Sequence, residues 1–387
     1  MNGINRDAAI ELLKLIVSVP SVNPAFQREG MDPTLFGEER LARALAEWIE
    51  AQGLSSELDF VEPGRPNLIM RVNGTSGGPR MLWEGHLDTV QVTNMAAPFS
   101  PRIEGGRLYG RGAVDDGGCV VAFLLAMRAL AADPPAGDVD FVAAMDEEFG
   151  FKGVTHHVAR GETYALGVAG EPTDLAVVRA CKGTVRWFVE LRGRPAHTAK
   201  PHEGLSAVTA GCKLLAAYEA EMATRTMAHP LLGPPTLTCT AFEAGEGPNT
   251  VPSKSRLRFD YRYLPTEDSM AVHAHFKTVA ERLESDIPGL SVIVEPPFVD
   301  SSAMDVPEDS RIVEEMCAVR AERGLPREVI GVPYGSDATK MVNVGAIPTI
   351  VFGPGNIDQA HSLDEYVEID QVVSAAEMLV ALARRVR

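Results

Sequence analysis

Cysteine is scarce in this sequence, with five residues in 387, and none of them stands in C-x-x-C spacing. An odd number of widely separated cysteines fits neither a disulfide framework nor a thiolate zinc site. We interpret each one as a small buried hydrophobic residue. They are Cys119, Cys181, Cys212, Cys239 and Cys317.

Long apolar runs and positive charge are also lacking. The longest apolar stretch, Cys119 to Leu130, contains Arg128 and is too short to cross a bilayer. The start, Met1 to Asp7, has no charged-then-apolar signal pattern, so a cytoplasmic location is expected. The formal net charge of −17 would repel phosphate backbones, so neither nucleic acid nor a membrane is expected as a partner.

Length and composition indicate an ordered protein of two domains. A chain of 387 residues exceeds what one hydrophobic core usually serves. Its 45% hydrophobic content is that of a globular protein and shows no sign of disorder.

The first part of the chain alternates short β-rich runs with a helical segment, the rhythm of an α/β sheet. Polar clusters directly follow two of the strands, and open α/β sheets bind ligands at the carboxyl ends of their strands. A site is therefore expected at that edge. The expected elements are strands at Asn67–Val72, Met81–Glu84, Asp140–Ala144 and Leu166–Ala169, and a helix at Gly117–Ala132.

After Cys181 the pattern changes to β-α-β-β-α-β, the split βαβ or ferredoxin-like arrangement. From Pro307 a helix, a strand at Ile347–Phe352 and a closing helix from Ile369 indicate a return to the first domain. We therefore expect a mixed-sheet α/β domain of residues 1–180 and 302–387, with an α+β domain of residues 181–301 inserted in it. The inserted elements are strands at Thr184–Leu191, Thr236–Glu243, Arg256–Tyr263 and Leu290–Glu295, and helices at Leu205–Ala223 and Ser269–Glu284.

The first polar cluster is Glu84-Gly85-His86-Leu87-Asp88. In an extended segment His86 and Asp88 project to one face, so one could bind a metal while the other orients it. Taken alone, this spacing is more often an ordinary surface histidine beside a turn aspartate.

The second cluster is a glycine-rich loop from Gly110 to Gly118 that ends in Asp115 and Asp116 before the apolar helix. Carboxylates at a helix start are also what simple capping predicts. A phosphate-binding loop is excluded because G-K-[ST] is missing and the two acids would repel pyrophosphate.

The third cluster, Asp146-Glu147-Glu148, follows an apolar strand. Three consecutive acids repel one another unless a cation compensates, which suggests a metal. One glutamate could bind it while the other works as a general base. Glu171 and His361 follow further strands, and each alone is more often part of a turn. Together the clusters place two histidines, an aspartate and two glutamates at strand ends of one sheet.

In this order the motifs resemble the co-catalytic zinc hydrolases that include acetylornithine deacetylase, succinyl-diaminopimelate desuccinylase, carboxypeptidase G and aminoacylase. The resemblance spans nearly the whole chain and implies five metal ligands: His86, Asp115, Glu148, Glu171 and His361. His86 and His361 would each hold one ion, and Asp115 would bridge the two. Glu148 would bind the first ion and Glu171 the second.

The same resemblance implies that Asp88 orients His86, that Glu147 is the general base and that a cis peptide bond follows Asp115. Two positions depart from the pattern. Gly117 follows the acidic pair where many members have lysine, and Thr339 stands where many have arginine. Both departures concern substrate choice and not metal binding.

Residues of the inserted domain and its return also match. The resemblance implies that this domain is a lid and dimerisation domain of a homodimer, in which His197 stabilises an oxyanion across the dimer interface. It further implies that Asn249 and Arg262 touch the substrate carboxylate, and that Gly335 and Ser336 belong to a glycine-rich loop beside the metals.

We therefore expect a two-metal hydrolase that uses water to cut the amide bond of a small N-acyl amino acid. Zinc is the expected metal, although cobalt or manganese would also suit these ligands. A dipeptidase, carboxypeptidase or aminopeptidase of the same family is an alternative. A non-catalytic metal-binding homologue is disfavoured, because a purely structural site has no use for Glu147.

Overall fold

The computed structural model describes residues 4–245 and 247–387. The chain forms two compact units: unit 1 comprises Met1–Arg179, Val306–Ile330 and Ser336–Arg387, and unit 2 comprises Ala180–Asp305 and Gly331–Gly335. Relative to the division expected from the sequence, unit 2 also includes residues 302–305 and a short return segment. The return segment is held by the Lys182 N–H, which donates to the carbonyl of Val332 over 3.2 Å.

A mixed sheet forms the centre of unit 1. Neighbouring strands are parallel within the group β6, β3, β7 and β16. On its two sides, β2 and β8 pair with this group in antiparallel fashion, and β1 is antiparallel to β2. The carboxyl ends of the parallel strands therefore meet at one edge of the sheet. The order is β1 (Ser56–Glu62), β2 (Arg65–Val72), β6 (Gly137–Ala144), β3 (Gly78–His86), β7 (Leu166–Ala169), β16 (Thr349–Val351), β8 (Val177–Cys181) and β14 (Met304–Asp305), with β15 (Val329–Val332) also pairing with β8.

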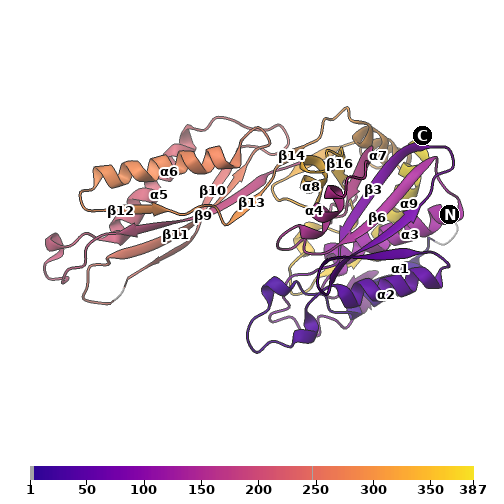
Figure 1. The fold of residues 1–387 in the computed structure, drawn as a ribbon, viewed down its shortest axis with the longest axis horizontal. Helices are drawn as coiled ribbons and strands as arrows, with labels where there is room; N and C mark the ends of the chain where they lie inside the picture. Colours follow the sequence, from indigo (N-terminus) through magenta and orange to yellow (C-terminus); the bar gives the residue numbers. More distant parts are fainter. Residues whose placement is uncertain (1–3, 246) are drawn as a thin grey trace. The chain divides into compact units, whose positions relative to one another are not determined.

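Helix α3 packs against β2, β3 and β6 of this sheet, and α1 and α9 pack against α3 (Figure 1). Helix α3 is apolar on nearly every side because it lies between the sheet and α1 and α9. A three-stranded sheet of β4 (Arg102–Glu104), β5 (Arg107–Tyr109) and β17 (Tyr366–Glu368) completes the unit. The helices are α1 (Arg6–Ser18), α2 (Glu39–Ala51), α3 (Gly118–Ala132), α4 (Lys152–Ala159), α7 (Arg311–Glu322), α8 (Ala338–Asn343) and α9 (Ile369–Arg385).

Unit 2 is an antiparallel sheet with two helices. Alternate residues of β9, from Val185 to Leu191, are buried, as a strand with one covered face requires. Both helices contact the sheet and each other. The order is β10 (Thr236–Ala244), β11 (Lys254–Tyr263), β9 (Gly183–Arg192) and β12 (Ser291–Val294), with β13 (Val299–Ser301) also on β9, and the helices are α5 (Ala207–Thr224) and α6 (Ser269–Asp286).

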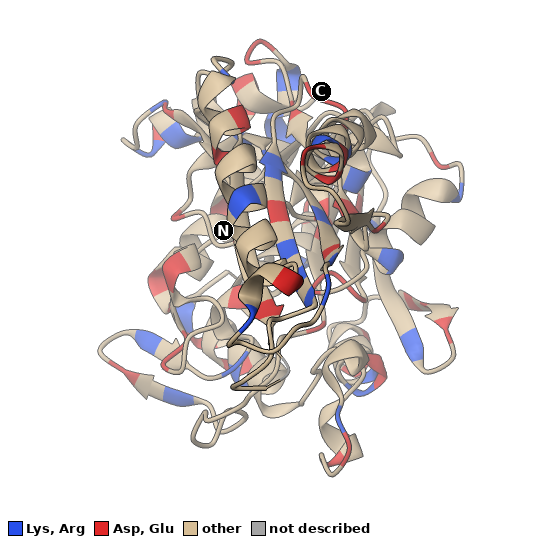
Figure 2. Cartoon of the chain, turned by 90° about the vertical axis from the view of Figure 1, so that its left-hand side faces the viewer, with Lys and Arg blue, Asp and Glu red and all other residues tan. Residues whose placement is uncertain are grey.

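The fold class expected from the sequence is confirmed, with a mixed α/β sheet in one unit and a ferredoxin-like strand order in the other. Each expected strand and helix is present within a few residues of its expected bounds. Helices α1, α2, α4 and α8 and the small sheet were not predicted. Among the described residues no helix is both long and apolar enough to cross a membrane. Acidic and basic residues are interspersed along the elements (Figure 2).

Candidate metal centre

Strand register brings the polar clusters of unit 1 to one place. His86 is the last residue of β3, where it pairs with Ala144 of β6. On the other side of β3, Glu84 pairs with Ala169 of β7. The residues that directly follow β6 and β7 therefore lie beside His86, at the edge where parallel strands end.

Two groups of side chains that could hold a metal ion form at this edge. In each group the potential ligand atoms lie within 4.8 Å of one another. Asp115 joins the groups, because its Oδ1 lies 2.9 Å from His86 Nε2 and its Oδ2 lies 3.1 Å from His361 Nε2. All five expected ligands and Glu147 are brought together here. The groups are His86, Glu147 and Glu171, and Asp115, Glu148 and His361.

The pairing of two glutamates with the histidines differs from the expected one. Glu148 Oε1 lies 3.3 Å from His361 Nε2, and Glu171 groups with His86. The register explains this arrangement. Ala169 of β7 pairs with Glu84 of β3, and Glu171 and His86 each lie two residues further along their own segments. Glu148 therefore belongs with the second histidine and Glu171 with the first.

Asp115 stands in a short irregular turn, Ala113–Gly117, before α3. The peptide bond from Asp115 to Asp116 is cis, as the resemblance implies. The carboxylate of Glu365 accepts hydrogen bonds from the N–H groups of Val114 and Asp115, over 3.1 and 3.3 Å, and pairs with Arg111. Glu365, buried and 250 residues away in sequence, thus positions the bridging aspartate, a role that the sequence did not reveal.

Asp88 contacts His86 in a different way from the one expected. His86 Nδ1 lies 2.9 Å from the main-chain carbonyl of Asp88, whereas the Asp88 carboxylate is 3.7 Å away. That carboxylate instead accepts from the N–H groups of Glu147 and Glu148, over 2.9 and 3.1 Å. Because its oxygens are occupied by these donors, the side chain of Asp88 holds the glutamate turn, and its backbone orients the imidazole.

Asn23, which sequence reasoning missed, connects this turn to the N-terminal part of the chain. It is fully buried, and its Nδ2 donates to Asp88 over 2.7 Å and to Asp146 over 3.0 Å. Arg65 also donates to Asp146, over 3.1 Å. A lone asparagine has no sequence signal for such a role, since its partners lie 65 and 123 residues away.

Burial and mutual repulsion dominate the electrostatics of the centre. Burial raises the pKa of Glu147 well above its ordinary value, and the neighbouring carboxylates Asp337 and Glu148 raise it further. The pKa of Glu171 is raised in the same way, first by burial and then by Glu147. Hydrogen bonds to Asp115 and Glu148 raise the pKa of His361 to about 10.

These shifts describe a cluster with an excess of negative charge. Two imidazoles face the carboxylates of Asp115, Glu147, Glu148 and Glu171, and buried carboxylates are costly unless a cation compensates them. Two divalent ions would offset this excess. Imidazole and carboxylate ligands also suit zinc and related ions, so the residues fit a two-metal centre.

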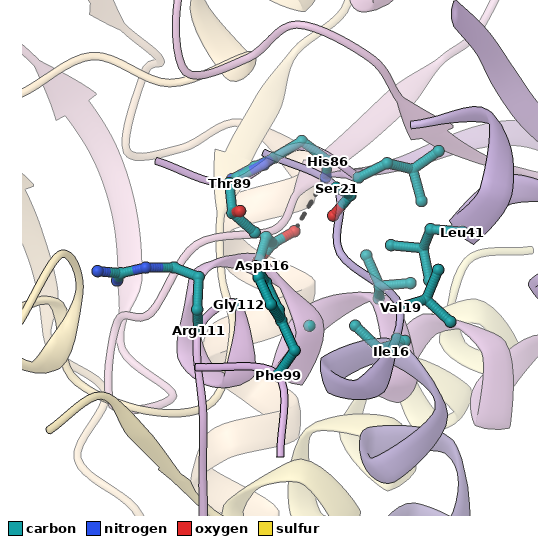
Figure 3. A pocket seen from close by; sticks show the side chains of 13 residues that line it. Ile16, Val19, Ser21, Leu41, His86, Thr89, Phe99, Arg111, Gly112 and Asp116 are labelled. Atoms are coloured by element: carbon teal, nitrogen blue, oxygen red, sulfur yellow. Dashed lines mark hydrogen bonds between the residues drawn. The ribbon is translucent and has the colours of Figure 1, made fainter. Parts of the chain in front are cut away.

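A small cavity lies behind His86 (Figure 3). Its volume of about 10 Å³ has room for no more than one water molecule, so it does not hold substrate. In Figure 3 the carboxylate of Asp116 accepts from the N–H of His86 over 3.1 Å. The cavity therefore belongs to the packing that holds β3 against the turn of Asp115.

Unit 2 brings two of the expected substrate-binding segments together. His197, which is exposed, pairs with Thr250, and the Thr198 N–H donates to the carbonyl of Asn249 over 3.0 Å. Arg262 lies on β11, where its Nε donates to Asp260 over 2.8 Å.

The glycine-rich loop spans the boundary of the two units. Gly335 ends the return segment of unit 2, and Ser336 is buried in unit 1, where its carbonyl accepts from Thr339 Oγ1 over 3.0 Å. The next residue, Asp337, is buried beside Glu84, and burial raises its pKa to about 7. Asp337 belongs to the segment that resembles the family's glycine-rich loop, but no separate role was expected for its carboxylate.

The chain was compared with known proteins. A family model described as Peptidase family M20/M25/M40 matches residues 82–385. Acetylornithine deacetylase of Myxococcus xanthus is 30% identical over 345 residues, which cover 86% of this chain and 88% of that protein. Acetylornithine deacetylase of Vibrio cholerae is 26% identical over 364 residues, which cover 89% of this chain and 90% of that protein.

Solved structures show the same fold. A tripeptidase from Staphylococcus aureus has a TM-score of 0.80 at 21% identity, covering 100% of this chain and 99% of the other. Aminopeptidase PepT from Bacillus cereus has a TM-score of 0.81 at 22% identity, covering 100% of both chains. With the family model matching most of its length and two groups of candidate metal ligands at the sheet edge, the chain belongs to peptidase family M20/M25/M40 and is a hydrolase of carbon–nitrogen bonds.

Proposed function

We propose that this protein is a metal-dependent amidohydrolase that cleaves the amide bond of N-acyl amino acids, releasing the acyl acid and the free amino acid. The observation that carries the proposal is the position of Asp115, whose two oxygens reach both imidazoles, 2.9 Å from His86 and 3.1 Å from His361. The similarity to acetylornithine deacetylases supports this substrate class.

The proposed metals are two zinc ions, with cobalt or manganese as substitutes. His86 and Glu171 would hold one ion, His361 and Glu148 the other, and Asp115 both. When bound, the ions polarise the amide carbonyl and lower the pKa of a water molecule.

Glu147 is the proposed general base. It groups with His86 and Glu171, and its backbone is fixed by the carboxylate of Asp88. Glu147 takes a proton from the attacking water and passes it to the leaving amine nitrogen as the amide carbon–nitrogen bond breaks. A role in which Glu147 moves protons does not require it to be a ligand.

His197 is the proposed oxyanion donor, contributed by the partner subunit of a homodimer that assembles through the inserted domain. Such donors are worth a factor of about 10²–10³ in kcat in comparable sites. Asn249, Arg262, Gly335 and Ser336 are the proposed substrate-binding residues. A cytoplasmic location remains a prediction from the sequence.

A peptidase is the second candidate function. The structural neighbours named as a tripeptidase and an aminopeptidase cover this chain entirely, and the same metals could bind a free amino terminus. We rank this activity below deacylation because the relatives named above that match by sequence, at 26% and 30% identity, are acetylornithine deacetylases.

Metal analysis and substrate screening test the proposal. The protein is reconstituted with zinc or cobalt and offered N-acetyl, N-succinyl and N-formyl amino acids alongside di- and tripeptides. We expect two divalent ions per chain by elemental analysis, turnover of an N-acyl amino acid and loss of turnover on chelation. Trace metal after zinc reconstitution would refute the two-metal site, and turnover of peptides alone would favour the second function.

A further inference from the structure

The most exposed large hydrophobic side chains of the described residues lie beside the metal centre. Phe149 is 65% exposed and directly follows Glu148, and Leu363 is 57% exposed and lies two residues after His361. Glu148 Oε1 and His361 Nε2 are 3.3 Å apart. Each of the two apolar residues therefore stands in a segment that carries one of these potential ligands. Single exposed hydrophobic residues are ordinary, but Phe149 also makes an aromatic contact beside this group.

Phe149 lies in a turn whose backbone is fixed by hydrogen bonds. The N–H groups of Gly150 and Phe151 both donate to the carbonyl of Asp146, over 3.0 and 2.6 Å. Asp146 has a left-handed backbone, with φ of 70°, a conformation that aspartate adopts more readily than most non-glycine residues. The Glu148 N–H donates to Asp88. The backbone on both sides of Phe149 is thus fixed.

A second aromatic ring faces Phe149. The ring of Phe26 meets it edge-on, with centroids 6.4 Å apart and planes at 89°. Phe26 ends a short 3-10 turn that begins after Asn23, and Asn23 Oδ1 caps that turn by accepting from Ala25 N–H over 2.9 Å. The Nδ2 of Asn23 donates to Asp146. The buried side chain of Asn23 therefore connects the turn that ends at Phe26 to the turn that carries Phe149.

We propose that Phe149, with Phe26, forms an apolar subsite that receives the aromatic or large aliphatic side chain of the amino acid in an N-acyl amino acid. The inference rests on the proposed function and names its substrate class. Aromatic side chains offer large apolar surfaces, and aromatic groups prefer offset or edge-on contacts with one another. A cationic side chain would need an anionic partner, which neither ring supplies, so N-acetylornithine is the contrasting substrate.

Substrate selectivity provides the first test. kcat/KM is measured for the zinc-loaded full-length protein with N-acetyl-L-phenylalanine, N-acetyl-L-alanine and N-acetyl-L-ornithine. We expect the phenylalanine derivative to exceed the alanine derivative by about 10–100-fold, the range that apolar pockets achieve. Phe149→Ser should lower kcat/KM for the phenylalanine derivative about tenfold, mainly through KM, and leave the alanine derivative within about twofold. Phe60→Ser, which removes a 46% exposed phenylalanine of β1, is the matched control and should match the parent.

Binding without turnover provides the second test. N-acetyl-L-phenylalanine is titrated calorimetrically into zinc-loaded Glu147→Ala protein, with and without Phe149→Ser. We expect the added substitution to weaken binding about tenfold. Unchanged affinity and unchanged selectivity would overturn the subsite. A preference of the parent for N-acetylornithine would overturn it as well.

Two further outcomes distinguish failure of the proposed function, and coverage of Phe149 by a second copy of the chain, from failure of the subsite. If no N-acyl amino acid is turned over, the proposed function fails, and the titration alone decides whether the subsite exists. If Phe149→Ser leaves selectivity unchanged but dissociates the protein in sedimentation velocity, a second copy covers Phe149, and the subsite is refuted.

Discussion

The side-chain amide of Asn23 donates to the carboxylate of Asp88 over 2.7 Å, inside the turn that carries the proposed general base. The same nitrogen donates to Asp146 over 3.0 Å. Asp88 in turn accepts from the N–H of Glu147. Asn23 therefore acts on Glu147 through two hydrogen bonds, and it is a positioning residue.

Asn23→Ala should both destabilise the protein and slow catalysis. It leaves two buried carboxylates short of a donor, which costs about 1–3 kcal/mol of unfolding free energy. We expect kcat to fall about tenfold with KM nearly unchanged, because the turn of Glu147 is less well placed. Urea denaturation and steady-state kinetics measure the two effects. Asn5→Ala, which removes the N-cap of α1 at a cost of about 1 kcal/mol, is the control and should leave kcat unchanged.

Glu147→Ala should abolish turnover while both metals remain bound. The loss of a general base costs a factor of about 10²–10⁴ in kcat. Glu147 groups with His86 and Glu171, so metal counting distinguishes a base from a ligand. Elemental analysis after dialysis is the measurement, and Glu148→Ala, which should lose one ion, is the comparison. A variant of Glu147 that retains only one ion would identify this residue as a ligand.

Gly85→Ala should disturb the contact between Asp116 and His86. A Cβ at this position would lie 2.6 Å from Asp116 Oδ2, the atom that accepts from the His86 N–H. Overpacking of this kind costs about 1–3 kcal/mol, and we expect weaker zinc binding besides. Denaturation of the metal-free protein measures the loss of stability, and zinc titration measures the loss of zinc affinity.

A double-mutant cycle tests the cause. If the clash with Asp116 is responsible, Gly85→Ala combined with Asp116→Ala should destabilise less than the sum of the two single changes. Strict additivity would show that the added methyl group acts through Val120 or Phe123, which lie 3.3 and 3.5 Å from it.

Local patterns predicted the elements whose surroundings are uniform along their length. The nearly unbroken apolar sequence of α3 reflects a helix buried on all sides, and the alternation in β9 reflects a strand with one covered face. Helix α2 was missed although its buried residues Leu41, Leu45 and Ile49 stand at the four-residue spacing of an amphipathic helix, so this pattern was available in the sequence.

The candidate site likewise contains residues that local patterns indicate and residues that they do not. The polar clusters around Glu148 and Glu171 were singled out because the end of a strand is visible in the sequence, and the full set of five ligands was implied by the family resemblance. The pairing of Glu171 with His86 was not predicted, because it depends on the register between β3 and β7. Glu365 and Asn23 were missed because their partners lie 250 and 65 residues away. Contacts at such separations have no local pattern in a single sequence.

Stability should depend on pH through His157, which is buried and lies 2.9 Å from the hydroxyl of Tyr164. Burial lowers its pKa from 6.5 to about 4. The unfolded chain therefore binds a proton more readily than the folded protein between these values. This contribution to stability is complete above pH 6.5 and is lost as the pH falls towards 4, by about 2 kcal/mol between pH 7 and pH 5.

Urea denaturation at pH 7 and pH 5 measures this loss. His157→Gln should lose about 2 kcal/mol less than the parent on acidification, because glutamine does not titrate. Equal pH dependence in His157→Gln and the parent would show that another group is responsible.

His197 is proposed to act on the active site of a partner subunit. It is exposed, lies between β9 and α5, and is separated in sequence from every candidate metal ligand. His197→Ala should lower kcat by about 10²–10³ without changing the metal content. His202→Ala removes another exposed histidine five residues further on and should leave kcat unchanged.

Mixing two inactive variants decides whether His197 acts in trans. In a heterodimer of Glu147→Ala with His197→Ala, action in trans gives one site with both defects and one with neither. Random reassortment of a symmetric dimer makes half of the dimers mixed, so roughly a quarter of all sites should regain activity. If His197 acts within its own chain, each site of the heterodimer keeps one defect. Verified heterodimers as inactive as either parent would therefore refute the proposal.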